Sequence, residues 1–277
     1  MFGIKDWTSD RWTAIATIVA FAALIQPWLA AAWKRFFRRG AVDIYETGTF
    51  EIGFSAFGPT IAVTGTLRSR DKDMFIPAIT VNLLTNGSAP RSFEWAGFRN
   101  AKALFATTAG QSQEVALEAP SGFMVSTAQP YRYNIIFIEP TTINQLRPIV
   151  DTFRKTWLDY FAQHSKLDLR AISSDPAAQI MVLNEMRQIY QAFSTTKAYN
   201  GALNSIRELF TWVQGTYQVR FEVHTAGPDG KYAETWRFSL TQGDVDSLGN
   251  NLTSILEEIV QMPLTAGMYF FAYPDYA

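Results

Sequence analysis

Few residues of this chain could carry chemistry, and their spacing favours no reaction. The chain has no cysteine, which excludes thiol nucleophiles, disulfides, zinc fingers and iron–sulfur sites together. The two histidines, His164 and His224, lie far apart, and neither belongs to a His-x-x-x-His or Glu-x-x-His pair, so a zinc or di-iron centre is unsupported. We expect His164 to lie near the end of a helix, where a cation suits the macrodipole, and His224 to lie on an exposed strand face.

Two pairs of aspartates could bind Ca²⁺, but each supplies only two carboxylates. Asp71 and Asp73 alternate with basic residues that would compensate them, and Asp244 with Asp246 suits the start of a helix. The sequence also lacks G-x-x-x-x-G-K-S/T, G-x-G-x-x-G and Gly-x-Ser-x-Gly, which argues against a phosphate loop and a nucleophile elbow. We therefore predict no catalytic, metal-binding or cofactor-binding residue, and a protein that is not an enzyme.

The overall charge gives no argument for nucleic acid as a partner. The net charge is −1, and no basic stripe interleaved with aromatic residues occurs beyond residues 34–39. Asn86-Gly-Ser88 and Asn251-Leu-Thr253 match the glycosylation sequon, a triplet that often arises by chance.

A long apolar run near the N-terminus predicts a membrane-spanning helix. Only Thr17, Gln26 and Pro27 interrupt it between residues 14 and 33, and at ~1.5 Å per residue it just spans a hydrocarbon core of ~30 Å. Tryptophan and basic residues at its ends suit the headgroup region. The sequence thus divides into a flank (1–11), a transmembrane helix (12–33) and a basic juxtamembrane linker (34–44). The expected anchor residues are Trp12, Trp28, Trp33, Lys34, Arg35, Arg38 and Arg39.

The charges beside this run predict its orientation. Four cations follow it against two before it, and cations near a span tend to stay in the cytoplasm. We therefore expect a single-pass membrane protein whose remaining residues face the cytoplasm. The alternatives are an exported domain and a cleaved signal peptide.

The rest of the chain reads as mainly β with a helical insertion. Period-two alternation over 45–139, with Gly, Pro and Asn turns, predicts an immunoglobulin-like antiparallel β-sandwich. Helical periodicity follows over 142–214, where Thr142 and Gln145 match a capping box, and strands return over 217–240. A lone hairpin is marginal in water, so we expect the late strands to complete the first sheet. A separate C-terminal α+β domain is the alternative.

The domain of residues 45–277 should end in a C-terminal helix that begins near Asp244, followed by an aromatic tail at 264–277. The tail either packs on its own domain or contacts a partner. Its residues considered for partner contact are Tyr269, Phe270, Phe271, Tyr273 and Tyr276.

These features favour a membrane-anchored binding or scaffolding protein that presents its domain at the bilayer surface. Its partners would be the bilayer and either another protein or further copies of itself. Three alternatives remain open: an enzyme or small-ligand sensor whose site forms only in the fold, an envelope-facing adhesion or assembly module, and an oligomeric membrane-disrupting effector in which Thr17 and Gln26 help helices associate.

Overall fold

The computed structural model describes residues 9–36, 40–47, 50–85, 89–107, 110–165, 176–226, 230–262 and 269–276. The helices are α1 (Ser9–Phe36), α2 (Pro140–His164), α3 (Pro176–Ser194), α4 (Lys197–Leu209) and α5 (Gln242–Ile259). The strands are β1 (Ala41–Glu46), β2 (Glu51–Ser55), β3 (Gly58–Arg70), β4 (Met74–Ile76), β5 (Ala78–Thr85), β6 (Arg91–Thr107), β7 (Gly110–Glu118), β8 (Phe123–Val125), β9 (Tyr131–Ile138), β10 (Gly215–His224) and β11 (Lys231–Leu240).

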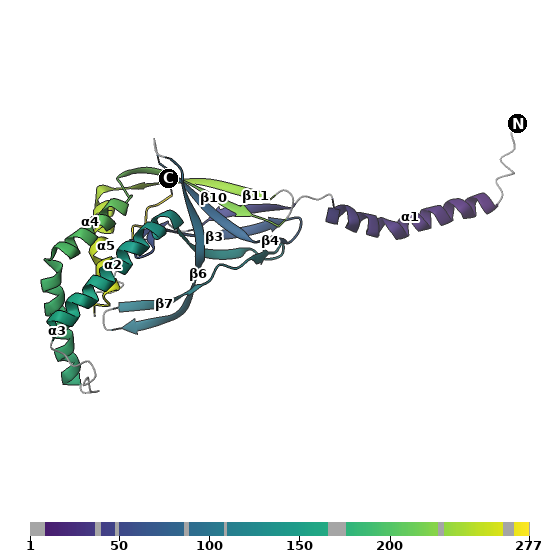
Figure 1. Cartoon of the computed structure of the whole chain (residues 1–277). Helices are drawn as coiled ribbons and strands as arrows, with labels where there is room; N and C mark the ends of the chain where they lie inside the picture. The colour runs from purple at the N-terminus through teal and green to yellow at the C-terminus, as the bar shows by residue number, and fades with distance from the viewer. Residues whose placement is uncertain are drawn as a thin grey trace.

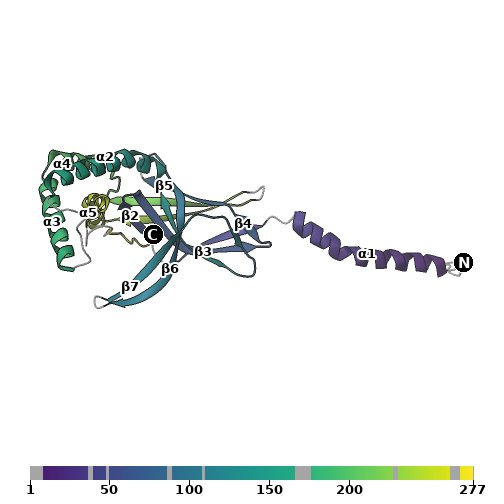
Figure 2. The same ribbon diagram turned by 60° about the horizontal axis from the view of Figure 1, so that its bottom comes forward.

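One antiparallel sheet curls into a nearly closed barrel. Its strand order is β1-β3-β9-β6-β5-β10-β11, and the edge strands β1 and β11 contact each other without being hydrogen-bonded neighbours. Strand β2 pairs with β3 beyond β1, so β1 and β2 together form one edge. We call the line where this edge meets β11 the seam. The β6–β7 hairpin diverges from the barrel, and β4 pairs with β8 in a separate short ribbon (Figure 2).

The predicted immunoglobulin-like sandwich is wrong, because the main strands belong to one curled sheet rather than two facing sheets. Alternation shows which side chains point inward in either architecture. It does not show whether a sheet closes or splits. Closure depends on bending in long strands, and β6 carries a bulge between Trp95 and Gly97 where it pairs with β9, a device that bends a strand.

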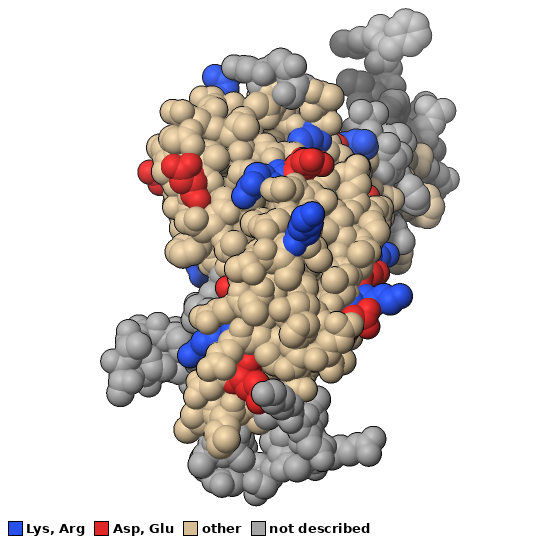
Figure 3. Space-filling view, turned by 60° about the vertical axis from the view of Figure 1, so that its left-hand side comes forward, with Lys and Arg blue, Asp and Glu red and all other residues tan. Residues whose placement is uncertain are grey.

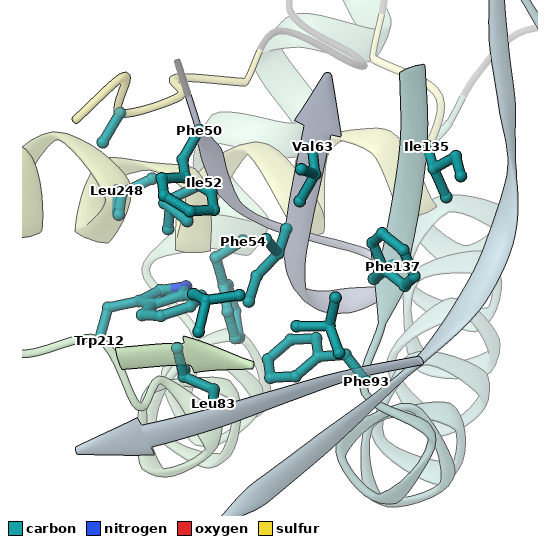
Figure 4. Close-up of a cluster of buried hydrophobic side chains, with 14 of the residues drawn as sticks. Phe50, Ile52, Phe54, Val63, Leu83, Phe93, Ile135, Phe137, Trp212 and Leu248 are labelled. Atoms are coloured by element: carbon teal, nitrogen blue, oxygen red, sulfur yellow. The ribbon is translucent and has the colours of Figure 1, made fainter. Parts of the chain in front are cut away.

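The barrel interior is filled by large apolar side chains from every strand of the main path. A barrel of this size is just wide enough for side chains to fill it. Figure 4 shows part of this core, in which Phe50, Ile52 and Phe54 of the β2 region belong to one cluster with Val63 on β3 and Phe137 on β9. Further fully buried members are Ile61, Val81, Phe93, Ile135, Val219, Phe221 and Phe238.

Helices α2 to α5 gather at one end of the barrel (Figure 1). Helices α2 to α4 separate the early and late strands along the chain but not in space. Strand β10 pairs with β5 from Tyr217 opposite Thr85 to His224 opposite Ala78. Helix α5 packs against β2, and Leu248 on α5 lies beside Phe50 and Ile52 (Figure 4). The helical block therefore covers the barrel end where β2 lies.

Helix α1 projects away from the opposite end of the barrel (Figures 1 and 2). Among the residues that the structure describes, no helix combines the length and apolarity needed to cross a membrane. The predicted transmembrane helix over 12–33 and the single-pass membrane localisation are thereby contradicted. Gln26 and Pro27 interrupt the run, and residues 14–25 before them span only ~18 Å. The expected linker is also too long, since residues 41–44 belong to β1.

Candidate functional site

Helix α1 carries seven exposed large apolar side chains, more than any other element among the described residues. They are 41–78% exposed, with Ile15 at the low end and Trp28 at the high end. The others are Ile18, Val19, Phe21, Leu24 and Leu29. Of the expected anchor residues only Trp28 has a described side chain. Trp12, Trp33, Lys34 and Arg35 are placed within α1 as backbone only, and Arg38 and Arg39 lie outside the described residues.

The aromatic tail packs on its own domain. Ala272 forms an antiparallel bridge with Ile52 of β2 through two backbone hydrogen bonds of 2.8 and 2.9 Å. Asn251 of α5 holds Phe270, two residues before Ala272, since its side-chain amide donates to the Phe270 carbonyl and accepts from the Phe270 N–H, both at 2.7 Å. Tyr269 donates a hydrogen bond to Glu258.

The five tail residues considered for partner contact divide by exposure. Phe270 and Tyr273 are 56% and 58% exposed, whereas Tyr269, Phe271 and Tyr276 are half-buried. The structure therefore brings three of them into the domain and leaves two on its surface. Whether the exposed pair meets a partner stays a prediction.

Tyr276 inserts its ring at the seam. The ring centroid lies 4.3 Å from that of Phe50, which precedes β2, and 5.8 Å from that of Trp236 on β11. Phe50 in turn contacts Trp236 and Phe238 at centroid distances of 6.1 and 5.1 Å. Tyr276 thus bridges the two edges of the barrel by ring packing.

Two hydroxyl groups near the seam are buried without a hydrogen-bond partner among the described residues, those of Tyr276 and Tyr133. Tyr133 on β9 is only 3% exposed and lies over Gly65, its partner on β3. Burial raises the pKa of the Tyr133 hydroxyl, and Tyr276 and Glu46 raise it further. Burial also raises the pKa of Tyr276, with a smaller contribution from Glu46. Gly65 is the register partner of both Glu46 on β1 and Tyr133 on β9, so these two side chains lie on the same face of the sheet.

The inserted Tyr276 ring contributes little net stability. Burying an aromatic side chain stabilises by ~1.5–3 kcal/mol. A buried hydroxyl without a partner costs ~1–3 kcal/mol, and the Tyr276 hydroxyl is such a group. This unpaired hydroxyl therefore offsets most of the gain from ring packing.

The residues that suggested catalysis or metal binding have structural roles. The His164 ring stacks on Tyr160 and its Nδ1 lies 2.8 Å from the Tyr160 carbonyl, while His224 Nε2 lies 3.2 Å from Thr80 Oγ1. Asp73 accepts hydrogen bonds from the backbone and side chain of Thr127 at 2.7 and 3.1 Å. The described part of the chain holds no group of three His, Cys, Asp or Glu suited to a metal ion.

Asp244 and Asp246, the second aspartate pair, make hydrogen bonds in the first turns of α5. Asp244 and Thr241 form a reciprocal capping box at the start of α5, and Asp246 accepts a 2.7 Å hydrogen bond from Gln242. The capping box expected at Thr142 is wrong, because α2 begins at Pro140 and the Thr142 hydroxyl donates to Glu139 instead.

Glu139 also forms a two-point ion pair across the helical end of the barrel. Arg91 on β6 donates to its carboxylate at 2.8 and 2.9 Å and packs over the rings of Phe93 and Trp212. Burial would raise the pKa of Glu139, but the hydrogen bonds from Arg91 and Thr142 outweigh it and the pKa lies below its usual range. This pair joins the barrel to α2.

The surface of the described residues has hollows, two of which are large enough to consider as binding sites. One, of about 730 Å³, lies against β8 and β9, with Met124, Tyr131 and Arg132 in its lining. The other, of about 450 Å³, lies between α2 and α4 over Phe153 and Gly201. Among the described residues, neither lining contains a histidine or a carboxylate. On the face drawn in Figure 3, charged residues of both signs are scattered among a larger uncharged surface, with no patch of one sign.

No protein-family model and no curated protein matches the chain. Function therefore has to be argued from the surfaces and side chains themselves.

Sequence reasoning missed the roles of two side chains near the seam and the tail. It treated Tyr133 only as part of the alternation of a strand, and Asn251 only as the first residue of a sequon. Asn251 is completely buried, so it cannot carry a glycan in the folded protein. An asparagine within the apolar stripe of a C-terminal helix was the available signal, because a buried amide needs hydrogen-bond partners.

Proposed function

We propose that this protein is a non-catalytic scaffold whose copies assemble through α1 and hold their barrels at defined positions around a common helical core. The observation that supports it is the exposed apolar surface of α1. Its large side chains cover most of the helix circumference, and Ala16, Ala20 and Ala23 occupy the rest. A helix that is apolar on all sides requires cover on all sides.

Further copies of α1 supply that cover with matching chemistry. Fully burying a large apolar side chain stabilises by ~1.5–3 kcal/mol. Covering half of the exposed area of these seven large residues of α1 would contribute on the order of 5 kcal/mol per helix by the same measure. Association costs ~4–15 kcal/mol, so two or more helices provide a sufficient gain.

Charge favours an antiparallel arrangement. Lys34, Arg35, Arg38 and Arg39 follow the apolar run, whereas the preceding residues Lys5, Asp6, Asp10 and Arg11 balance to zero. Parallel helices would place two sets of four cations together. At ~10 Å in water each such pair costs about 0.4 kcal/mol before salt screening. Antiparallel helices separate these clusters.

The first test is the mass of the full chain in solution, compared between Leu24→Glu and Met181→Glu. Both residues are exposed, at 69% and 70%, but Leu24 is on α1 and Met181 on α3. Light scattering after size exclusion should give a multiple of 31.2 kDa for the native chain and Met181→Glu, and 31.2 kDa for Leu24→Glu. A native chain that stays monomeric, or binds vesicles as a monomer, overturns the proposal.

The second test determines the direction of the helices. Because the chain lacks cysteine, Ala16→Cys and Leu29→Cys place single thiols at equal distances from the middle of 12–33. Antiparallel pairing predicts a disulfide when the two variants are mixed and little when Ala16→Cys is oxidised alone. Efficient cross-linking of Ala16→Cys with itself contradicts the antiparallel arrangement.

A further inference from the structure

The seam presents an aromatic surface that one residue of the tail covers. Phe50 and Trp236, one from each edge of the barrel, contact each other at this surface, and Phe238 also contacts Phe50. A third aromatic ring can pack against both of them in tilted or edge-to-face geometry. In this structure the ring is that of Tyr276.

The attachment of this residue is weak. The tail is fixed at Phe270 by Asn251 and at Ala272 by the bridge to Ile52. Beyond Ala272, Tyr273 and Asp275 are exposed, and Tyr276 is held at the seam by its ring contacts with Phe50 and Trp236. The last residues can therefore leave the seam while the rest of the tail stays bound.

The polar groups beside the ring are unsatisfied. The Tyr133 hydroxyl is buried with no partner among the described residues, and so is the hydroxyl of Tyr276. Tyr276 is tethered through the backbone to Ala272, so its hydroxyl cannot move freely toward Tyr133. An untethered phenol can turn to accept a hydrogen bond from Tyr133.

We propose that the seam is a binding site for one small planar aromatic molecule that carries a hydroxyl group, and that Tyr276 is its built-in, displaceable occupant. The ligand replaces the tyrosine ring that packs against Phe50 and Trp236, and it satisfies Tyr133. The tail then acts as a competitor within the chain, so the apparent affinity falls with the fraction of molecules in which the seam is open. This proposal does not depend on assembly through α1.

The test uses p-cresol, which is the tyrosine side chain without its backbone, and toluene, which has the same ring without the hydroxyl. Calorimetry on the full chain should show that Tyr276→Ala binds p-cresol more tightly than the native chain does, because no tail competes. It should also bind p-cresol about tenfold more tightly than toluene, the effect of about one hydrogen bond. Adding Tyr133→Phe to Tyr276→Ala should reduce that ratio to about one.

Hydrogen exchange distinguishes a natural site from a cavity made by mutation. In the native chain, p-cresol should increase amide exchange at Tyr273, Asp275 and Tyr276 without increasing it at Ala272. Tyr276→Phe keeps the ring and removes its unpaired hydroxyl, so it should fold at least as stably as the native chain and bind p-cresol more weakly. Equal binding of p-cresol and toluene by Tyr276→Ala, no binding at all, or unchanged exchange in the native chain each overturns the proposal.

Discussion

Replacing Asn251 by leucine tests how the tail is held. Asn251 is completely buried on α5, and its amide makes two hydrogen bonds of 2.7 Å to the backbone of Phe270. Leucine has nearly the same size but neither donates nor accepts. The substitution therefore removes both bonds while changing the packing volume little.

The expected loss follows from the two bonds and the groups left behind. Each hydrogen bond contributes ~0.5–1.5 kcal/mol, and a buried group left unpaired costs ~1–3 kcal/mol. If the tail is released into water, its backbone groups are hydrated, and this limits the cost of unpaired groups. We therefore expect a loss of about 3 kcal/mol in the free energy of unfolding. At ~2–4 °C per kcal/mol for a chain of this size, the melting temperature should fall by roughly 6–12 °C.

Urea unfolding and hydrogen exchange measure the two parts of this prediction. Exchange should increase at residues 269–276, and the loss of stability should appear at the urea midpoint. Asn250→Leu is the matched control, because Asn250 is exposed on the same helix, and surface changes usually stay within ±0.5 kcal/mol. A stability loss below ~0.5 kcal/mol for Asn251→Leu, with unchanged exchange in the tail, would refute the reasoning.

Two further predictions test the barrel. Glu139 has a lowered pKa in the fold, so its pair with Arg91 stabilises fully above the unfolded pKa and is lost as pH falls through the folded value. Glu139→Gln should therefore lower stability at pH 7 and flatten its decline below about pH 4.5, as urea midpoints will show, and an unchanged pH profile would exclude the pair as the cause. At Gly65, a Cβ would overlap the Tyr133 hydroxyl and lie 2.5 Å from a backbone oxygen, so Gly65→Ala should cost about 3 kcal/mol. Gly201→Ala, in α4 with nothing within 4 Å, should instead stabilise by ~0.5–1 kcal/mol, and equal effects at both glycines would contradict the steric argument.

Local patterns predicted many of the elements. Alternation at Tyr217, Val219 and Phe221 corresponds to β10, and the proline at position 176 begins α3. Asp244 belongs to the capping box of α5, as its third helical residue, although the N-cap itself is Thr241. These signals depend on near neighbours in the chain, which is why they can be read directly.

Patterns whose outcome depends on distant segments were less informative. The apolar run at 12–33 predicted a helix correctly but its environment incorrectly. Strand β1 was read as part of a linker, because its partner is residues 65–70 of β3. No local signal connects these segments.

The sequence by itself determined the type of most elements, the inward face of the strands and the lack of cysteine chemistry, because periodicity and composition act over a few residues. Tertiary structure alone decided that the strands close into one barrel rather than two sheets, that the tail enters the seam, and that Tyr133 and Tyr276 come together with their hydroxyls unpaired. These features arise from contacts between residues far apart in the chain. Their geometry depends on how the whole sheet curls, which alternation does not encode.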